Sequence, residues 1–322
     1  MRDNIIFLIS QPRSGSTFLQ FRLSKNTQLS TTGEPWFLLP VFKEDFELRL
    51  TNEKQPYNKK LCTNATEEFI NSIENFPDIK KKIELDFYCE ICNSVLKKEN
   101  ANKFIDKTPR YYYIIDELIK SFPKSHIIIL YRNPMAVLNS ILNTWIHKDY
   151  PLILNHKDDL LLAPNILAGH KNNEKLIKVN YEDIIKNPKI ELMKLCELLK
   201  IDFEESMIKD FSQKKQKYKF GDPVNVYSKN KFSVSLTNNW KNNINAQKWR
   251  FFNDYLNLLG KETIDKLGYS YNEIKEVLDN SKPSTYSHIF TFSLNFFFSK
   301  FSIFILFPLT TLKRRFRNKF FK

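Results

Sequence analysis

Short runs of apolar residues alternate along the chain with segments whose apolar residues recur at helical spacing. The runs predicted to be strands are Ile5–Ile9, Leu29–Thr32, Lys103–Ile105, His126–Tyr131 and Leu176–Val179. The segments predicted to be helices are Thr17–Ser24, Tyr112–Ser121, Pro134–Trp145 and Ile190–Leu199. Apolar strands that alternate with amphipathic helices are typical of a parallel sheet that is buried on both faces. The pattern therefore predicts an α/β fold with a central parallel sheet flanked by helices.

Two regions depart from this alternation. The segment Phe42–Asn100 is helical and rich in Lys and Glu, and we expect it to form an insertion beside the substrate site. A Ser-rich stretch around Pro283 marks a boundary, so we divide the chain into a main domain at residues 1–280 and a tail at residues 281–322. The tail holds 11 of the 28 Phe residues and eight basic residues, but no acidic residue.

The segment Ile289–Leu312 of the tail is almost wholly apolar and exceeds the roughly 20 residues that span a bilayer. In a spanning helix, however, Lys300 would cost about 3 kcal/mol near the centre, and Pro308 would bend the helix. We therefore expect an in-plane helix or short anchor at an anionic membrane surface. The alternative is that the tail packs on the domain or on a second subunit. The lipid-facing side chains would be Phe290, Leu294, Phe297, Phe301, Phe304 and Ile305.

The composition narrows the classes of partner and cofactor. With 322 residues, 6 Gly and 4 Cys, the chain is neither collagen-like nor a disulfide scaffold. The formal net charge of +14 predicts an anionic partner, but the tail supplies more than half of it, so we expect no nucleic acid. Cys89 and Cys92 form a lone CxxC pair, which we interpret as helical core because zinc needs about four ligands, and we expect no metal.

The first apolar run, Ile5–Ile9, is too short to be the core of a signal peptide. Pro12 and Arg13 follow it and end the run. We therefore expect the protein in the cytoplasm, with its tail at the inner face of the membrane.

The first predicted strand runs directly into a polar turn and then into a helix. Amides in such a turn and at a helix N-terminus lack intrahelical partners and bind anions. The turn offers a guanidinium group suited to phosphate or sulfate oxygens, a glycine that allows close approach, and three hydroxyl groups. These residues are Arg13, Ser14, Gly15, Ser16 and Thr17. The alternative is an ordinary capped corner; the Walker A sequence GxxxxGK[ST] is absent, which weakens an ATP-dependent function.

A second cationic position follows the predicted strand His126–Tyr131. Arg132 comes directly after that strand, at the edge where parallel strands of an α/β fold bind ligands. Ser140 lies about two helical turns further on, from where its hydroxyl can reach a second phosphate. Together with the first turn, these residues predict a site for a ligand that carries two anionic groups.

These two motifs resemble those of sulfotransferases that use 3′-phosphoadenosine 5′-phosphosulfate (PAPS). The family's first motif holds the 5′-phosphosulfate and is matched by Pro12–Leu19, which includes Phe18. Its second motif holds the 3′-phosphate and is matched by Arg132 and Ser140. The closest similarity is to tyrosylprotein and bacterial carbohydrate sulfotransferases. The resemblance implies a P-loop NTPase-like three-layer fold and the transfer of a sulfuryl group from PAPS to a hydroxyl acceptor, which we expect to be a carbohydrate or glycolipid.

The resemblance also implies roles for three residues outside these motifs. Glu34, within Gly-Glu-Pro, stands where a family Glu serves as the base. Lys107 matches a family Lys that stabilises the transferring group, and Tyr181 matches a Tyr that contacts the nucleotide.

A further family segment closes over the cofactor and corresponds to the region around Trp240. The family has Arg-Lys-Gly several residues before this Trp, whereas this chain has Ser233-Val234-Ser235. Lys231 and Lys241 are the candidate substitutes for the missing cations.

The chemistry of sulfuryl transfer suits these residue types. An SO₃-like group passes from a phosphate to an acceptor oxygen, so positioning and charge stabilisation should dominate. Arg13 and Lys107 can stabilise the charge, and Glu34 can accept the proton of the acceptor hydroxyl. The rival base is His126 or another His, although the place of His126 at the start of a buried strand favours a structural role and no motif surrounds His147, His156 or His170. Glu34 has the alternative of being a surface carboxylate.

Two other functions stay open at this point. A nucleotide-dependent kinase of related fold would need a Walker Lys and an acidic Mg²⁺ ligand, and neither is evident. A non-catalytic membrane-associated module would retain the turn only as a relic. The presence together of Arg13, Glu34, Lys107, Arg132 and Ser140 argues against such decay.

Overall fold

The computed structural model of the chain describes residues 2–43, 59–147, 149–171, 175–209 and 232–283, together with Leu294. The described strands form one sheet with the order β2-β3-β1-β4-β5, in which every neighbouring pair is parallel. The strands are β1 (Ile5–Ser10), β2 (Leu29–Thr31), β3 (Lys103–Lys107), β4 (His126–Tyr131) and β5 (Leu176–Asn180). Each apolar run that predicts a strand coincides with one to within two residues at its end, and the predicted α/β fold with a central parallel sheet is confirmed.

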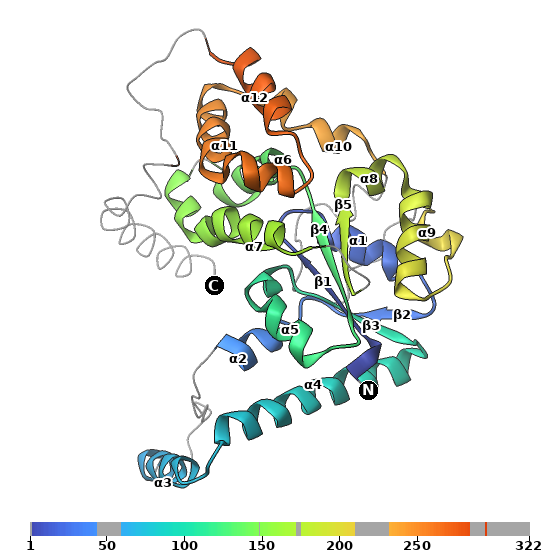
Figure 1. Ribbon diagram of the computed structural model, residues 1–322, viewed down its shortest axis with the longest axis vertical. Helices are drawn as coiled ribbons and strands as arrows, with labels where there is room; N and C mark the ends of the chain where they lie inside the picture. The colour runs from blue at the N-terminus through green and yellow to red at the C-terminus, as the bar shows by residue number, and fades with distance from the viewer. Residues whose placement is uncertain are drawn as a thin grey trace, which may run out of the picture.

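Helices lie on both faces of the sheet (Figure 1). The α-helices of the described residues are α1 (Ser16–Leu23), α2 (Leu38–Lys43), α3 (Lys59–Asn71), α4 (Phe76–Glu99), α5 (Ile115–Ser121), α6 (Pro134–Ile141), α7 (Ala163–Gly169), α8 (Tyr181–Lys186), α9 (Pro188–Leu199), α10 (Ser235–Asn238), α11 (Ala246–Lys266) and α12 (Tyr271–Asn280). Shorter 3₁₀ or π turns are Arg2–Asn4, Pro109–Ile114, Leu142–Ile146, Tyr150–His156, Asp158–Leu162, Glu205–Met207 and Lys241–Asn243.

Alternate side chains of the strands pack against different helical layers. In β1, Ile5, Phe7 and Ile9 belong to a core with residues of α4, α5 and α7. Ile6 and Leu8 belong to a second core with residues of α1, α8 and α9. Because successive side chains point to opposite faces, a strand covered on both faces needs apolar residues at consecutive positions. This requirement explains the continuous apolar runs of the sequence.

The strand order brings two candidate ligand-binding turns together. β1 lies between β3 and β4; the chain continues from β1 to the edge strand β2 and from β4 to the opposite edge strand β5. Ser10, the last residue of β1, is paired in register with Leu130 of β4. Ligands of open α/β sheets bind at the carboxyl ends of strands whose connections diverge in this way. The turns that carry Arg13 and Arg132 leave the sheet at this point.

Two predicted helices are shorter than their apolar spacing indicates. The segment Tyr112–Ser121 is α-helical only from Ile115, because its first residues belong to the 3₁₀ turn Pro109–Ile114. The segment Pro134–Trp145 is α-helical only to Ile141 and continues as the π turn Leu142–Ile146. The Thr144 hydroxyl donates a 2.6 Å hydrogen bond to the Ser140 carbonyl and competes there with the backbone amide. This competition accounts for the wider turn.

The Lys/Glu-rich insertion contains α3 and α4, and its residues 44–58 lie outside the described part of the chain. α4 runs along the lower side of the body in Figure 1 and extends past it toward α3. Cys89 and Cys92 on α4 are 3% and 1% exposed, so the interpretation of the CxxC pair as helical core is confirmed.

Most of the tail, including Lys300, Pro308 and the basic cluster, lies outside the described residues. Among the described residues, no helix is both long enough and apolar enough to cross a membrane. Leu294 is described, and its side chain is fully buried in a core with residues of α6, α11 and α12. Its amide donates a 3.0 Å hydrogen bond to Asp254. At Leu294 the chain therefore packs on the domain, and the expectation that this side chain faces lipid is wrong.

A buried carboxylate links several elements on the α4 side of the sheet. Asp106 of β3 has no exposed surface and accepts hydrogen bonds from Tyr88 (2.6 Å), Thr108 (2.8 Å) and Tyr111 (3.2 Å). Burial raises the pKa of Asp106 to about 6, although these hydrogen bonds and the charge of Lys107 oppose the rise. The folded protein therefore binds a proton at this carboxyl more tightly than the unfolded chain does.

This shift predicts a pH dependence of the free energy of unfolding. The contribution of Asp106 is complete below its ordinary pKa of 3.8 and is lost as the pH rises through about 6. The full shift corresponds to roughly 3 kcal/mol. Asp106→Asn keeps an acceptor but does not titrate, so wild type should lose about that much stability relative to the variant between about pH 4 and pH 7. Urea unfolding of both proteins across this range measures the difference, and a constant difference would contradict the prediction.

Candidate active site

The turn after β1 depends on a glycine. Gly15 has φ +93° and ψ 17°, a left-handed conformation that glycine adopts without steric cost. A Cβ atom at this position would lie 2.6 Å from the ring of Tyr181, which is too close for packed atoms. Gly15 therefore allows the turn to approach Tyr181 just before the first amides of α1, where anions bind.

The structure brings the two cationic motifs into contact. Arg13 donates hydrogen bonds from Nε to Ser140 Oγ (3.2 Å) and from Nη2 to Thr144 Oγ1 (3.4 Å). Arg132 donates from Nη1 to the backbone carbonyl of Arg13 (3.1 Å). Arg13 and Ser140 are 127 positions apart in the sequence, yet they share one cluster at the carboxyl ends of β1 and β4. Two guanidinium groups in one cluster favour an anionic ligand.

Tyr181, at the start of α8, lies beside the same cluster. The guanidinium carbon of Arg132 is 4.5 Å from the centre of the Tyr181 ring, and the Phe18 ring contacts it edge-on at 6.0 Å. Burial raises the pKa of the Tyr181 hydroxyl, which therefore stays a hydrogen-bond donor at neutral pH. The site thus places an aromatic side chain next to its cations.

The hydroxyl groups of the turn fit an anion with several oxygens. Ser14 is 1% exposed, and its buried Oγ has no hydrogen-bond partner in the described part of the chain. A buried hydroxyl without a partner is unfavourable, so this atom suits a ligand oxygen. Ser16 and Thr17 occupy the first turn of α1, where the helix dipole favours negative charge.

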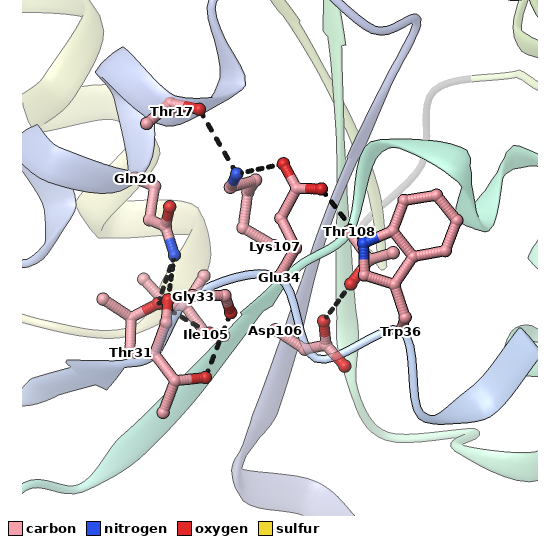
Figure 2. A network of polar contacts seen from close by, with 11 residues as sticks. Thr17, Gln20, Thr31, Gly33, Glu34, Trp36, Ile105, Asp106, Lys107 and Thr108 are labelled. Atoms are coloured by element: carbon pink, nitrogen blue, oxygen red, sulfur yellow. Dashed lines mark hydrogen bonds and ion pairs between the residues drawn. The ribbon is translucent and has the colours of Figure 1, made fainter. Parts of the chain in front are cut away.

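Lys107 and Glu34 form an ion pair at the end of β3 (Figure 2). The Lys107 side chain is 0% exposed, and its Nζ donates to Glu34 Oε1 (2.6 Å) and to Thr17 Oγ1 (3.2 Å). A buried ammonium group requires a charged partner, so this pair fixes Glu34 beside the anion-binding turn. The Glu34 side chain is 17% exposed and is therefore partly accessible.

Sequence analysis does not identify Trp36, which lies two residues after Glu34. Its indole Nε1 donates to Glu34 Oε2 (3.1 Å), and the Arg110 guanidinium lies 5.4 Å from its ring centre. Gln20 of α1 holds the same loop through a 2.6 Å hydrogen bond to the Thr32 carbonyl. An aromatic residue directly after Gly-Glu-Pro is the signal that could have identified Trp36.

A second buried carboxylate supports this side of the site. Asp159 is 2% exposed and accepts two hydrogen bonds from Arg110, at 2.8 Å and 2.5 Å, and one from Tyr112 at 3.0 Å. Burial alone would raise the pKa of Asp159, but hydrogen bonds from His156, Arg110 and Tyr112 outweigh it and lower the pKa. Gln11 of the first turn donates to the Asp159 carbonyl (2.8 Å). No motif predicts this cluster, because its members are far apart in the sequence.

The remaining candidate residues are Lys231, Lys241 and His126. Lys231 lies outside the described residues. Lys241 is exposed, lies 5.9 Å from the Trp240 ring centre, and makes no hydrogen bond to the other candidates within the described residues. His126 begins β4 and pairs with Ile6 near the amino ends of the strands, whereas Glu34 lies at the carboxyl ends. The described part of the chain contains no group of three or more His, Cys, Asp or Glu side chains that could hold a metal ion.

Known proteins resemble this chain in sequence and in fold. Nodulation protein NoeE of Sinorhizobium fredii is 30% identical over 141 residues, which are 44% of this chain and only 32% of NoeE. The sulfotransferase domain of the Synechococcus PCC 7002 olefin synthase has a similar fold, with a TM-score of 0.53 and 22% identity over 82% of this chain and 93% of that domain. A sulfotransferase domain of the curacin biosynthetic pathway gives a TM-score of 0.50 and 21% identity, over 83% and 98% of the two chains.

The comparison with protein families agrees with these similarities. The model of the Sulfotransferase family matches residues 5–205, which is more than half of the chain. This match includes both cationic motifs, the Lys107–Glu34 pair and Tyr181. The chain therefore belongs to the sulfotransferase family.

Proposed function

We propose that the protein transfers a sulfuryl group from PAPS to a hydroxyl group of a carbohydrate or glycolipid. The observation that carries this proposal is the Lys107–Glu34 ion pair, which joins a partly accessible carboxylate to a buried cation beside an anion-binding turn. A carboxylate is a suitable base for a hydroxyl proton, and the cation suits a transferring group with developing negative charge.

The donor would bind along the carboxyl edge of β1 and β4. The turn amides, Ser14 and Arg13 would hold the 5′-phosphosulfate, and Arg132 and Ser140 would hold the 3′-phosphate. Tyr181 would lie against the nucleotide. The contact between Arg13 and Ser140 supports this assignment, because it brings the two proposed phosphate sites to one cluster.

In the proposed reaction, Glu34 accepts the proton of the acceptor hydroxyl. The acceptor oxygen bonds to sulfur while the bond from sulfur to the phosphate oxygen breaks, and the electron pair leaves on that phosphate. Lys107 and Arg13 stabilise the charge on the sulfuryl oxygens and on the leaving phosphate. No metal enters this scheme, since two cationic side chains supply the required charge.

The proposed acceptor class rests on two tryptophans, Trp36 beside Glu34 and Trp145 beside Arg13. Trp36 and Trp145 are partly exposed, and Trp145 lies 5.4 Å from the Arg13 guanidinium carbon. Flat aromatic faces beside polar groups suit a ring that carries hydroxyl groups on its edge. We place the catalytic domain at residues 1–280.

The first test concerns the donor. Adenosine 3′,5′-bisphosphate should bind at least about tenfold more tightly than adenosine 5′-monophosphate, since one charge-assisted contact contributes about 1.5–3 kcal/mol. Arg132→Ala should remove most of this preference, whereas Lys194→Ala, at an exposed position of α9, should not. Calorimetric titration measures the affinities. Equal affinities of the wild-type protein for the two nucleotides would contradict the assignment of Arg132. If ATP is titrated in the same way and binds more tightly than the bisphosphate, the result would favour a kinase.

The second test concerns the base. Glu34→Gln keeps the shape of the side chain but cannot accept the acceptor proton, so the single-turnover rate should fall by about 10²–10⁴ with donor affinity nearly unchanged. Glu262→Gln is the matched control, because Glu262 also binds a Lys at 2.6 Å but on the exposed surface of α11. If Glu34→Gln lowers the single-turnover rate by less than about threefold, Glu34 is a surface carboxylate and not the base.

The third test concerns the tail, which we propose to be directed to an anionic membrane surface through its basic residues. Each cation near such a surface contributes about 1 kcal/mol at low salt. Replacement by Gln of Lys313, Arg314, Arg315 and Arg317 should therefore weaken sedimentation with anionic liposomes and leave nucleotide binding unchanged. The change spares Leu294, whose burial in the domain would complicate a truncation. Equal sedimentation of the two proteins would exclude this role.

A further inference from the structure

Trp36 has an unusual backbone conformation for its side chain. Its φ is +57°, in the left-handed region that bulky residues rarely adopt. Glycine would occupy this position without steric cost, whereas tryptophan adopts this backbone conformation at a cost in free energy. Strained residues of this kind cluster at functional sites, and the contacts of Trp36 indicate what its side chain does.

The Glu34 carboxylate is held at both oxygens by different donors. Oε1 accepts from the Lys107 ammonium at 2.6 Å, and Oε2 accepts from the Trp36 indole at 3.1 Å (Figure 2). Oε1 faces the Lys107 ammonium group, whose side chain has no exposed surface. The neutral indole donor occupies only one of the acceptor sites of Oε2, so that oxygen keeps capacity for a second hydrogen bond.

The Trp36 ring packs against Arg110, which forms an ion pair with Asp159. Arg110 lies 5.4 Å from the ring centre and is fixed by two hydrogen bonds to the buried Asp159. The Asp159 backbone accepts from Gln11, which also donates to the Tyr255 hydroxyl at 3.1 Å. A continuous series of contacts therefore joins the indole to the turn that binds the donor.

We infer that Trp36 is the positioning residue of the base: it turns the Glu34 carboxylate so that Oε2 receives the proton of the acceptor hydroxyl. This inference rests on the proposed role of Glu34. The acceptor O–H bond breaks, the proton passes to Oε2, and the acceptor oxygen forms its bond to sulfur while the leaving phosphate takes the electron pair of the old bond. Trp36 itself exchanges no proton.

The test replaces the indole by a ring without a donor. Trp36→Phe should lower kcat roughly 10- to 100-fold, as expected for the loss of a hydrogen bond to a charged group, and leave the KM for PAPS within about twofold. Trp249→Phe is the matched control, because it also loses an indole hydrogen bond, to the Leu278 carbonyl, but in the core between α11 and α12. This control should change neither constant by more than about twofold. An unchanged kcat in folded Trp36→Phe would overturn the inference.

A double-mutant cycle separates positioning from general structural damage. If Trp36 acts through Glu34, adding Trp36→Phe to Glu34→Gln should lower the residual kcat by less than about threefold. A full additional loss would overturn the inference. If Glu34→Gln alone is nearly as active as wild type, the proposed base fails; if Glu34→Gln is slow but Trp36→Phe is not, only the positioning role fails.

A second variant tests whether a loss of activity in Trp36→Phe comes from a disturbed backbone. Trp36→Gly removes the ring and the left-handed strain together, so its backbone should keep the native turn. It should bind adenosine 3′,5′-bisphosphate as wild type does and lose at least as much kcat as Trp36→Phe. Full kcat in this variant would overturn the inference as well.

Discussion

The site is organised around the burial of a single ammonium group. Lys107 at the end of β3 has no exposed side-chain surface, and an unpaired charge in that position would cost several kcal/mol. Its partners, Glu34 and Thr17, come from a loop after β2 and from α1. Pairing Lys107 therefore requires three chain segments to meet at one point, and that point is the carboxyl edge of the sheet. The same contact that satisfies the buried charge leaves a carboxylate beside an anion-binding turn.

The proposed donor site is mostly local in sequence, and for this reason the sequence alone can suggest it. Arg13 to Thr17 form one turn, and each of their proposed contributions follows from residue type and from the strand–turn–helix context. The continuous apolar runs predict the strands because both faces of the sheet are covered, as the six buried residues of β1 show. Arg132 and Ser140 needed only the additional rule that parallel strands end at the same edge.

The acceptor side could not be predicted in the same way. Arg110 and Asp159 are 49 positions apart, and Gln11 and Asp159 are 148 apart, so no window of sequence contains their pairing. The helical spacing of apolar residues does not predict the π turn after α6 either. That turn depends on a hydrogen bond from the Thr144 hydroxyl to a backbone carbonyl, which the spacing does not encode. Trp36 was overlooked because a bulky residue in a left-handed conformation contradicts local preference.

This asymmetry has a consequence for how the two substrates are recognised. The proposed anion contacts of the turn come mainly from adjacent residues, although Arg13 also bonds to Ser140 and Gly15 packs against Tyr181. Trp36, Arg110 and Asp159, by contrast, form a series of contacts beside Glu34 that leads to Gln11. The Gln11 side chain also binds Tyr255 of α11, 244 residues away. Substitutions in α11 that move Tyr255 can therefore shift Gln11, and with it both Asp159 and the turn after β1. In the proposed scheme, the side chains around Glu34 therefore depend on contacts between distant segments, whereas the proposed donor contacts come mainly from two motifs that are each local in sequence.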